Sequence, residues 1–132
     1  MRRHPEKISY QGRQSRMQAG FLNFYGAVLN VRQERSDLIA NNIANADTPN
    51  YKAVDVPFNS ALTDALGAQA NTSSGPEYRQ DGVVGLNGND VSLDSERVEA
   101  AQNGQELQAS TIFLHQSTTD LVTAFRPNPS GI

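Results

Sequence analysis

Two stretches near the ends of the chain carry apolar residues at helical spacing, and they constrain the fold more than any other feature. In residues 18–46 the apolar positions follow a 3-4-3 spacing, and in residues 92–126 leucines recur every seven residues. This is the repeat by which helices pair along a seam. The predicted helix seam comprises Phe21, Phe24, Val28, Val31 and Leu38 in the first stretch, and Leu107, Leu114, Leu121 and Phe125 in the second.

Both halves of the predicted seam contain polar interruptions. Arg35 stands where the first helix needs an apolar residue, and Thr111 and Thr118 alternate with the leucines of the second. A helix without a continuous apolar stripe is marginal on its own in water. The sequence therefore predicts a mainly α fold with long N- and C-terminal helices. We expect them to pair as a coiled-coil-like antiparallel hairpin, to meet other subunits with their remaining faces, and to be largely disordered before assembly.

The remaining residues have the composition of tails and loops. We predict a basic, flexible N-terminal tail at residues 1–17 and a short C-terminal tail at residues 127–132. Residues 47–91 are rich in turn-forming residues, and they are expected to form a turn, a short extended segment and a flexible loop. The predicted axial helices occupy residues 18–46 and 92–126.

The middle segment contains weaker signals of regular structure. Apolar and polar residues alternate from Val54 to Phe58, which is typical of a short strand. Pro57 cannot donate to a sheet, so the strand is expected to be isolated or at an edge. We also predict a short helix within residues 60–69 and, further along, at most a short extended piece near Val83-Val84.

The second long helix has clear start and stop signals. It is expected to begin around Ser92–Asp94 and to end at Phe125, because Arg126 and Pro127 follow. Acidic residues near the start favour the positive end of the helix dipole, and they are Asp94, Glu96 and Glu99.

Composition allows one small domain with a thin core. The chain has 132 residues, of which 37% are hydrophobic, and it contains no Trp and no Cys. Disulfides and thiolate chemistry are therefore excluded. The net charge of −3 conceals a basic leader, since Arg and Lys outnumber the single acid in residues 1–16. The leader lacks the aromatic residues or apolar face of a nucleic-acid or membrane segment, so we interpret it as a solvated tail. A translation start nearer Met17 is an alternative.

Nothing in the sequence predicts catalysis, a metal site or a cofactor. His4 and His115 have no acids arranged around them, although a metal site needs several convergent ligands. The acids near residue 92 lack the spacing of a calcium-binding loop, and Gly82–Gly88 lacks the Lys-Ser/Thr that follows a phosphate-binding loop. We therefore predict that the protein is not an enzyme. No apolar run reaches the length of a signal-peptide core or a membrane span.

Residues 38–52 contain an unusual concentration of asparagine at the end of the first helix. Asn41, Asn42 and Asn45 fall within five residues, although asparagine is a mediocre helix former. Their spacing places pairs of these carboxamides on one helical face. Thr48-Pro49-Asn50-Tyr51 then indicates a type I or type II turn. A frayed helix end would account for such a run in a generic sequence.

The run is longer and more specific than a frayed end. It resembles the N-terminal signature of the flagellar axial proteins, in which a helix carries a segment like Ser-Asn-Ile-Ala-Asn-x-x-Thr-Pro-Gly-Tyr-Lys. Asn50 stands in place of the usual glycine, and both residues tolerate the left-handed region. The resemblance implies an assembly motif formed by Asn41, Asn42, Ile43, Ala44, Asn45, Thr48, Pro49, Asn50, Tyr51 and Lys52.

The resemblance covers about residues 20–125. The segment Lys52–Phe58 and the segment Asn87–Glu96, with Ser92 in place of an acid, are similar to the short proximal-rod branch of the family. Gln108-Ala109-Ser110 also corresponds, although Leu107 replaces the usual tyrosine and Gly104 weakens the helix. The chain has no room for the central domains of hook and distal-rod subunits.

The resemblance implies a structural subunit of the proximal rod, the drive shaft that crosses the bacterial periplasm. The implied partners are other copies of the chain, other rod subunits, the rod–ring junction protein at the base and the flagellar type III export apparatus, which reads no cleaved signal. We further hypothesise that the carboxamides of Asn42 and Asn45 satisfy polar groups at a subunit junction. The alternative is a soluble helical adaptor or export-chaperone-like module. Neither nucleic-acid binding nor a membrane span is expected.

Overall fold

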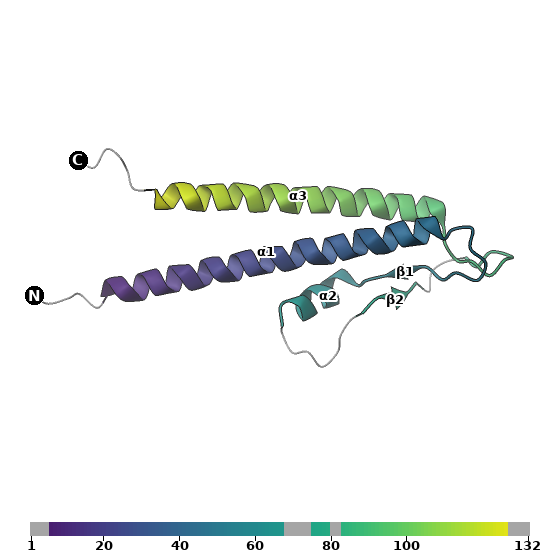
Figure 1. The fold of residues 1–132 in the computed structure, drawn as a ribbon, viewed down its shortest axis with the longest axis horizontal. Helices are drawn as coiled ribbons and strands as arrows, with labels where there is room; N and C mark the ends of the chain where they lie inside the picture. The colour runs from purple at the N-terminus through teal and green to yellow at the C-terminus, as the bar shows by residue number, and fades with distance from the viewer. Residues whose placement is uncertain (1–5, 68–74, 80–82, 127–132) are drawn as a thin grey trace, which may run out of the picture.

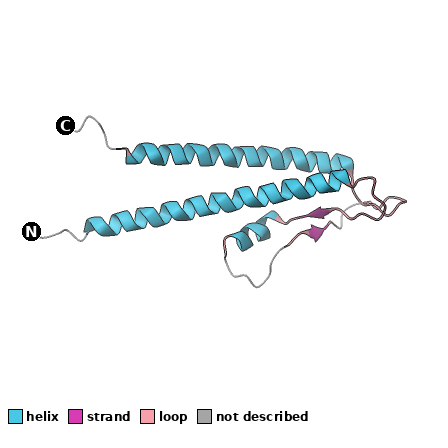
Figure 2. Cartoon of the chain, viewed as in Figure 1, coloured by secondary structure: helices cyan, strands magenta, loops and turns pink. Residues whose placement is uncertain are grey.

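A computed structural model describes residues 6–67, 75–79 and 83–126, with side chains from residue 12 onward. Two long helices dominate it (Figures 1 and 2). The elements are, in order, α1 (Glu6–Ala44), β1 (Val54–Asp55), α2 (Phe58–Ala65), β2 (Glu77–Tyr78) and α3 (Leu93–Phe125). The predicted tail residues 1–5 and 127–132, and with them His4, lie outside the described residues.

The helices α1 and α3 lie side by side in opposite directions, so the prediction of a mainly helical fold with paired terminal helices is confirmed. Figure 1 shows the pair close together at the end where the loops join them and further apart toward the chain termini. We call these two ends the loop end and the open end. The middle segment packs against α1 through β1 and α2, in the half nearer the loop end, and β2 pairs with β1.

The first helix is longer than predicted. It begins at Glu6, so residues 6–17, predicted as part of a flexible tail, are helical. The physical reason is that these residues contain no proline, and extending an existing helix requires no new nucleation. An apolar face, which was the basis of the prediction, is not required for that extension.

The second long helix has the predicted ends. Ser92 is extended, with φ of −98°, and its Oγ accepts a hydrogen bond from the Ser95 N–H at 3.4 Å, as an N-cap residue does. The helix ends at Phe125, and Gly104 does not interrupt it.

The middle segment combines confirmed and corrected predictions. Val54 starts an extended segment as predicted, and α2 forms two residues earlier than the expected start at residue 60. At most a short extended piece was expected near Val83-Val84, and no strand forms there; the second strand is Glu77–Tyr78. It pairs antiparallel with β1, and the Arg79 N–H continues the pairing with the Ala53 carbonyl at 2.9 Å. Residues 77–78 are a strand because they pair with β1, which is distant in the sequence, and not because of their own apolar content.

A small apolar core lies between α1 and the middle segment. Val31, Val56 and Ala61 form it, and Leu38 and Phe58 pack against it. Val31 and Leu38 of the predicted seam thus contact the middle segment. Among the described residues, no helix is both long and apolar enough to cross a membrane.

Candidate functional site

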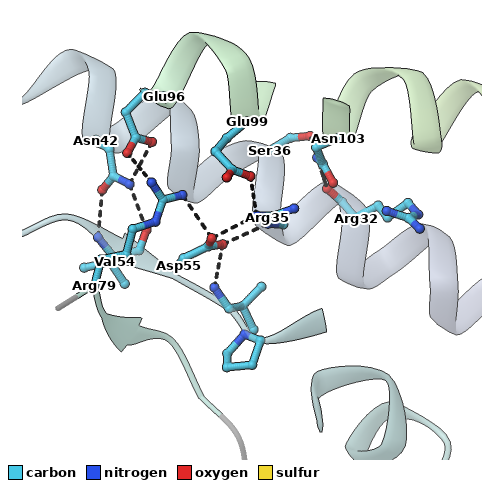
Figure 3. Close-up of polar contacts among 12 residues, drawn as sticks. Arg32, Arg35, Ser36, Asn42, Val54, Asp55, Arg79, Glu96, Glu99 and Asn103 are labelled. Carbon is cyan, nitrogen blue, oxygen red and sulfur yellow. Dashed lines mark hydrogen bonds and ion pairs between the residues drawn. The ribbon is translucent and has the colours of Figure 1, made fainter. Parts of the chain in front are cut away.

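Five charged side chains and one asparagine meet where α1, the two strands and α3 converge. Figure 3 shows them as one connected set of hydrogen bonds and ion pairs. We call this set the junction cluster. It consists of Arg35 and Asn42 from α1, Asp55 from β1, Arg79 directly after β2, and Glu96 and Glu99 from α3.

Asp55 is the centre of the junction cluster. Arg35 donates to it through Nε and Nη2, both at 3.0 Å, and Arg79 Nη2 donates at 3.0 Å. Arg35 Nη2 also reaches Glu99 at 2.6 Å, so one guanidinium joins β1 to α3. Such a two-bond pairing of Arg with a carboxylate fixes direction as well as distance.

The arginines lower the pKa of Asp55. Burial alone would raise the pKa of this carboxyl, but hydrogen bonds from Arg35, the Val56 N–H and Arg79 outweigh it, so the pKa lies below its ordinary value of 3.8. The hydrogen bond to Asp55 in turn raises the pKa of the Arg35 guanidinium against the opposing effect of burial. Both groups are therefore held in their charged forms.

Glu96 is 1% exposed and is fully paired. Arg79 Nη1 donates to one carboxylate oxygen at 2.6 Å, and Asn42 Nδ2 donates to the other at 3.1 Å. A buried carboxylate without partners would be strongly destabilising. The prediction that this acid serves the helix dipole was therefore incomplete, because its main partners lie on other elements.

Asn42 connects the first helix to the strand that follows it. Asn42 is 0% exposed, and its side chain makes with the Val54 backbone the two hydrogen bonds that a neighbouring strand would make. Its Nδ2 donates to the Val54 carbonyl at 2.8 Å, and its Oδ1 accepts from the Val54 N–H at 3.0 Å. The Tyr51 hydroxyl donates to the same Oδ1 at 3.3 Å. The hypothesis that this carboxamide reaches across a subunit junction is wrong for Asn42, since its capacity is used within the chain.

The other asparagines of the run have different surroundings. Asn41 is exposed and thus does not share the buried position of Asn42. Asn45 Nδ2 donates to the Asn41 carbonyl at 2.8 Å, and its Oδ1 accepts from the Thr48 hydroxyl at 3.1 Å. These contacts close the helix end. A contact of Asn45 with another subunit remains a prediction.

The turn after the helix is a type II turn. The Tyr51 N–H donates to the Thr48 carbonyl at 3.3 Å, and Asn50 has φ of +60°, which type II requires at that position. The Asn50 N–H donates to the Asn87 carbonyl at 3.0 Å, and Gly88, at φ of +78°, packs against the Asn50 side chain. A Cβ at residue 88 would collide with that side chain, so glycine is required there.

Two polar residues before α3 attach its start to the turn. Asn89 Nδ2 donates to the carbonyls of Asn45 and Thr48, at 2.9 and 2.7 Å. Asp90 Oδ1 accepts from the Ala53 N–H at 2.6 Å. Both side chains are buried. Sequence reasoning gave neither a role, although both lie in the segment that carries the family resemblance.

A further polar contact joins the long helices beyond the junction cluster. Asn103 Nδ2 donates to the Arg32 carbonyl at 2.9 Å and to the Ser36 hydroxyl at 2.7 Å. Arg32 also pairs with Glu106 and lies over the Phe58 ring. Asn103 and Arg79 were missed because their partners are more than fifteen residues away in sequence, beyond the reach of any local pattern.

The remaining predicted residues lie mainly on the surface. Of the assembly motif, Ile43, Ala44, Pro49 and Lys52 are exposed. Of the predicted seam, Val28 is buried, and Phe21 lies 6.5 Å from Phe113 of α3 by ring centroids. Phe24 and Phe125 are 39% and 60% exposed. The three leucines Leu107, Leu114 and Leu121 are half-buried.

The described residues contain no group of three or more histidines, cysteines or acids placed to hold a metal ion. His115 is exposed on α3. The junction cluster holds four segments in one arrangement: α1, β1, the residue after β2, and α3.

This chain is similar to proteins of the bacterial flagellar rod. A family model described as flagella basal body rod protein matches residues 28–52, the part of α1 and the turn that supplies Arg35 and Asn42. The flagellar basal body rod protein FlgB of Cereibacter sphaeroides is 33% identical, over 80% of this chain and 93% of the relative. FlgB of Aeromonas hydrophila is 34% identical over 74% of this chain and 86% of the relative. FlgB of Escherichia coli strain K12 is 36% identical over 67% of this chain and 80% of the relative.

Proposed function

This chain belongs to the FlgB family of flagellar basal-body rod proteins, and we propose that it builds the rod by covering the exposed faces of its paired helices with neighbouring subunits. It is a structural subunit of the proximal rod and not an enzyme. It assembles with rod subunits in the flagellar basal body. Membership of this family sets aside the alternative of a soluble adaptor.

The observation that carries the proposal is the set of apolar side chains left exposed along the open half of the hairpin. Single exposed apolar residues are ordinary, but here seven large apolar side chains remain in contact with water on the open halves of both helices. Covering such side chains contributes about 25 cal/mol for each Å² removed from water. The exposed side chains are Met17, Leu22 and Phe24 on α1, and Ile112, Phe113, Val122 and Phe125 on α3.

The two halves of the hairpin differ in how they are held. The loop half has the apolar core, the junction cluster and the contacts of Asn89 and Asp90. The open half has aromatic contacts such as Tyr25 with Phe113, at 5.1 Å between ring centroids. We therefore restrict the proposed folding on assembly to the open half, and we expect the loop half to be folded in the free chain.

We propose a finer placement of the subunit, which family membership supports. In this proposal the subunit lies in the part of the rod that spans the periplasm, and it contacts other copies, other rod subunits and the rod–ring junction protein at the base. It reaches the rod through the flagellar export apparatus without a cleaved signal. These statements rest on the resemblance of residues 20–125 to proximal-rod subunits.

The test is a matched pair of variants in a strain that lacks its own copy of the gene. Ile112→Glu places a charge on the exposed apolar face of α3, and Gln105→Glu places the same charge at an exposed polar position of the same helix. We expect the Gln105→Glu strain to swim and its basal bodies to contain the subunit. The Ile112→Glu strain should be non-motile, with a stable protein that is missing from purified basal bodies. Swimming and incorporation at the level of the control would contradict the proposal.

A further inference from the structure

Asparagine is followed by glycine at two places in the chain, Asn87-Gly88 before α3 and Asn103-Gly104 within it. An asparagine in such a pair is prone to lose its side-chain nitrogen as ammonia, because glycine has no Cβ to shield the backbone nitrogen that attacks the carboxamide. The two pairs share this intrinsic reactivity. Any difference between their rates of deamidation therefore comes from the structure around them.

The reaction closes a ring and then reopens it. At Asn87, the backbone nitrogen of Gly88 gives up its proton to a base in the solvent and bonds to the side-chain Cγ. The Cγ–Nδ2 bond breaks, and this nitrogen takes up a proton from water and leaves as ammonia. Water then hydrolyses the resulting succinimide. Opening at Cγ gives aspartate, whereas opening at the main-chain carbonyl gives isoaspartate, so the reaction consumes water and releases ammonia without an oxidant or a reductant.

The carboxamide of Asn87 lies in surroundings that favour this attack. Its side chain is exposed, so water reaches it. Its Oδ1 accepts a hydrogen bond from the Asn89 N–H at 3.1 Å. This oxygen gains negative charge as the ring closes, so a backbone donor already directed at it stabilises the transition state. The leaving nitrogen, Nδ2, donates to no other group among the residues that the structure describes.

The backbone nitrogen of Gly88 stays accessible although its N–H is hydrogen-bonded. The N–H donates to the Gly85 carbonyl at 2.9 Å, and the N–H bond lies in the plane of the peptide group. The electron pair that attacks Cγ lies above and below that plane. The hydrogen bond therefore orders the loop without blocking the reaction.

Asn103 has the opposite surroundings. It is 1% exposed, so the water that hydrolysis needs does not reach it. Its Nδ2 donates to the Arg32 carbonyl at 2.9 Å and to the Ser36 hydroxyl at 2.7 Å, and Figure 3 shows the side chain directed at α1. Two acceptors on the other helix thus hold the leaving nitrogen. Gly104 lies inside α3, and helical backbone angles keep its nitrogen away from the Asn103 Cγ.

We propose that Asn87 is a site of spontaneous deamidation in the folded chain and that Asn103 is protected by its place between the long helices. Reaction at Asn87 adds a negative charge beside the turn that ends α1. Isoaspartate also inserts a CH₂ group into the backbone, which moves the residue-87 carbonyl away from the Asn50 nitrogen, 3.0 Å from it in the unmodified chain. The contact of Lys52 Nζ with the Gly88 carbonyl, at 3.2 Å, is displaced as well. The modification therefore detaches the loop before α3 from the turn, whether or not the chain is part of a rod.

The first test compares the two asparagines in one sample. The purified full chain is kept in mildly alkaline buffer, where circular dichroism verifies that it is folded, and a second sample is unfolded in guanidinium chloride. Digestion in acid, where deamidation is slow, and mass spectrometry then give the extent of reaction at each asparagine. In the folded chain Asn87 should react at least about tenfold faster than Asn103, the factor that corresponds to breaking one hydrogen bond of the leaving nitrogen. In the unfolded chain the two rates should be similar, because both residues precede glycine.

Two results overturn the proposed site. The first is equal rates at Asn87 and Asn103 in the folded chain. The second is a rate at Asn87 no faster than at Asn59, an exposed asparagine that is followed by serine. Failure of the proposed rod function changes neither measurement, since both are made on the free chain.

The second test separates the added charge from the altered backbone. Asn87→Gln keeps a carboxamide but must close a larger ring, so it should stay unmodified in the same buffer. Asn87→Asp carries the charge on an ordinary backbone. Hydrogen exchange at the Asn50 amide should be at least about tenfold faster in wild-type chains that contain isoaspartate, verified by isoaspartyl-methyltransferase labelling, than in either variant. Equal exchange in all three samples would overturn the detachment of the loop.

Discussion

Replacement of Asn42 by alanine tests whether the junction cluster holds the middle segment on the helices. The side chain supplies a donor and an acceptor to the peptide groups of Val54 and a donor to Glu96. Alanine keeps the helix but removes these three hydrogen bonds and the weaker one from the Tyr51 hydroxyl to Asn42 Oδ1. The adjacent Asn41 is exposed on the same turn of helix. Asn41→Ala is therefore a matched control that shares any change in helix propensity.

The magnitude follows from the groups that lose their partners. A buried donor or acceptor left unpaired costs about 1–3 kcal/mol. Val54 is half-buried, so each of its two peptide groups is assigned the low end of that range. Glu96 keeps the bond from Arg79 but loses one donor in a site with almost no exposure. The sum is about 3 kcal/mol, which is a large part of the free energy of unfolding of a small domain.

The assay is urea unfolding of the purified chain, followed by far-ultraviolet circular dichroism. Asn42→Ala should lower the unfolding midpoint by more than about 1 M urea relative to Asn41→Ala, at the slope typical of small domains. Asn41→Ala itself should change the free energy of unfolding by less than about 0.7 kcal/mol. Coincident unfolding curves for the two variants would refute the reasoning, because they would show that the buried carboxamide contributes nothing beyond an exposed one.

Three other substitutions have defined outcomes. The folded pKa of Asp55 lies below its unfolded value of 3.8, so its contribution is present above that value and is lost as pH falls through and below it. Asp55→Asn should therefore make the urea midpoint less dependent on pH between about 5 and 3, and parallel pH profiles for variant and wild type would contradict this. Gly88→Ala should lower the free energy of unfolding by about 1–3 kcal/mol, because φ is +78° and a Cβ meets the Asn50 side chain; an unchanged urea midpoint would count against it. Gly104→Ala should raise the melting temperature, because a Cβ there meets nothing within 4 Å and alanine is favoured in a helix by about 1 kcal/mol; a lowered melting temperature would show that the space is needed.

Local patterns predicted much of the fold because helices and turns are governed by neighbours in sequence. The end of α3 at Phe125 and its N-cap at Ser92 follow from residues within one turn. The turn pattern around Pro49 allowed type I or type II, and the positive φ of Asn50 in the structure selects type II. The start of α1 was misplaced, since helix extension into residues 6–17 leaves no apolar signature in the sequence.

The partners within the candidate site could not be predicted in the same way. Asn42 and Glu96 are 54 residues apart, and Arg79 lies 24 residues from Asp55. In the sequence, Asn42 is a polar position on a helix and Glu96 is an acid near a helix start. Asp55 and Arg79 are two charged residues of the middle segment. Their pairing depends on how α3 returns along α1 and on how β2 pairs with β1, and both are long-range events.

The sequence by itself determined the two long helices, the turn that ends the first and membership of a flagellar rod family, because these depend on periodicity and short motifs. The tertiary structure alone decided which asparagine is buried, where the charges meet and which apolar side chains stay exposed. The physical reason is that burial is a property of the packed chain. A carboxylate such as Glu96 is tolerated in the interior only because Arg79 and Asn42 reach it from two other segments.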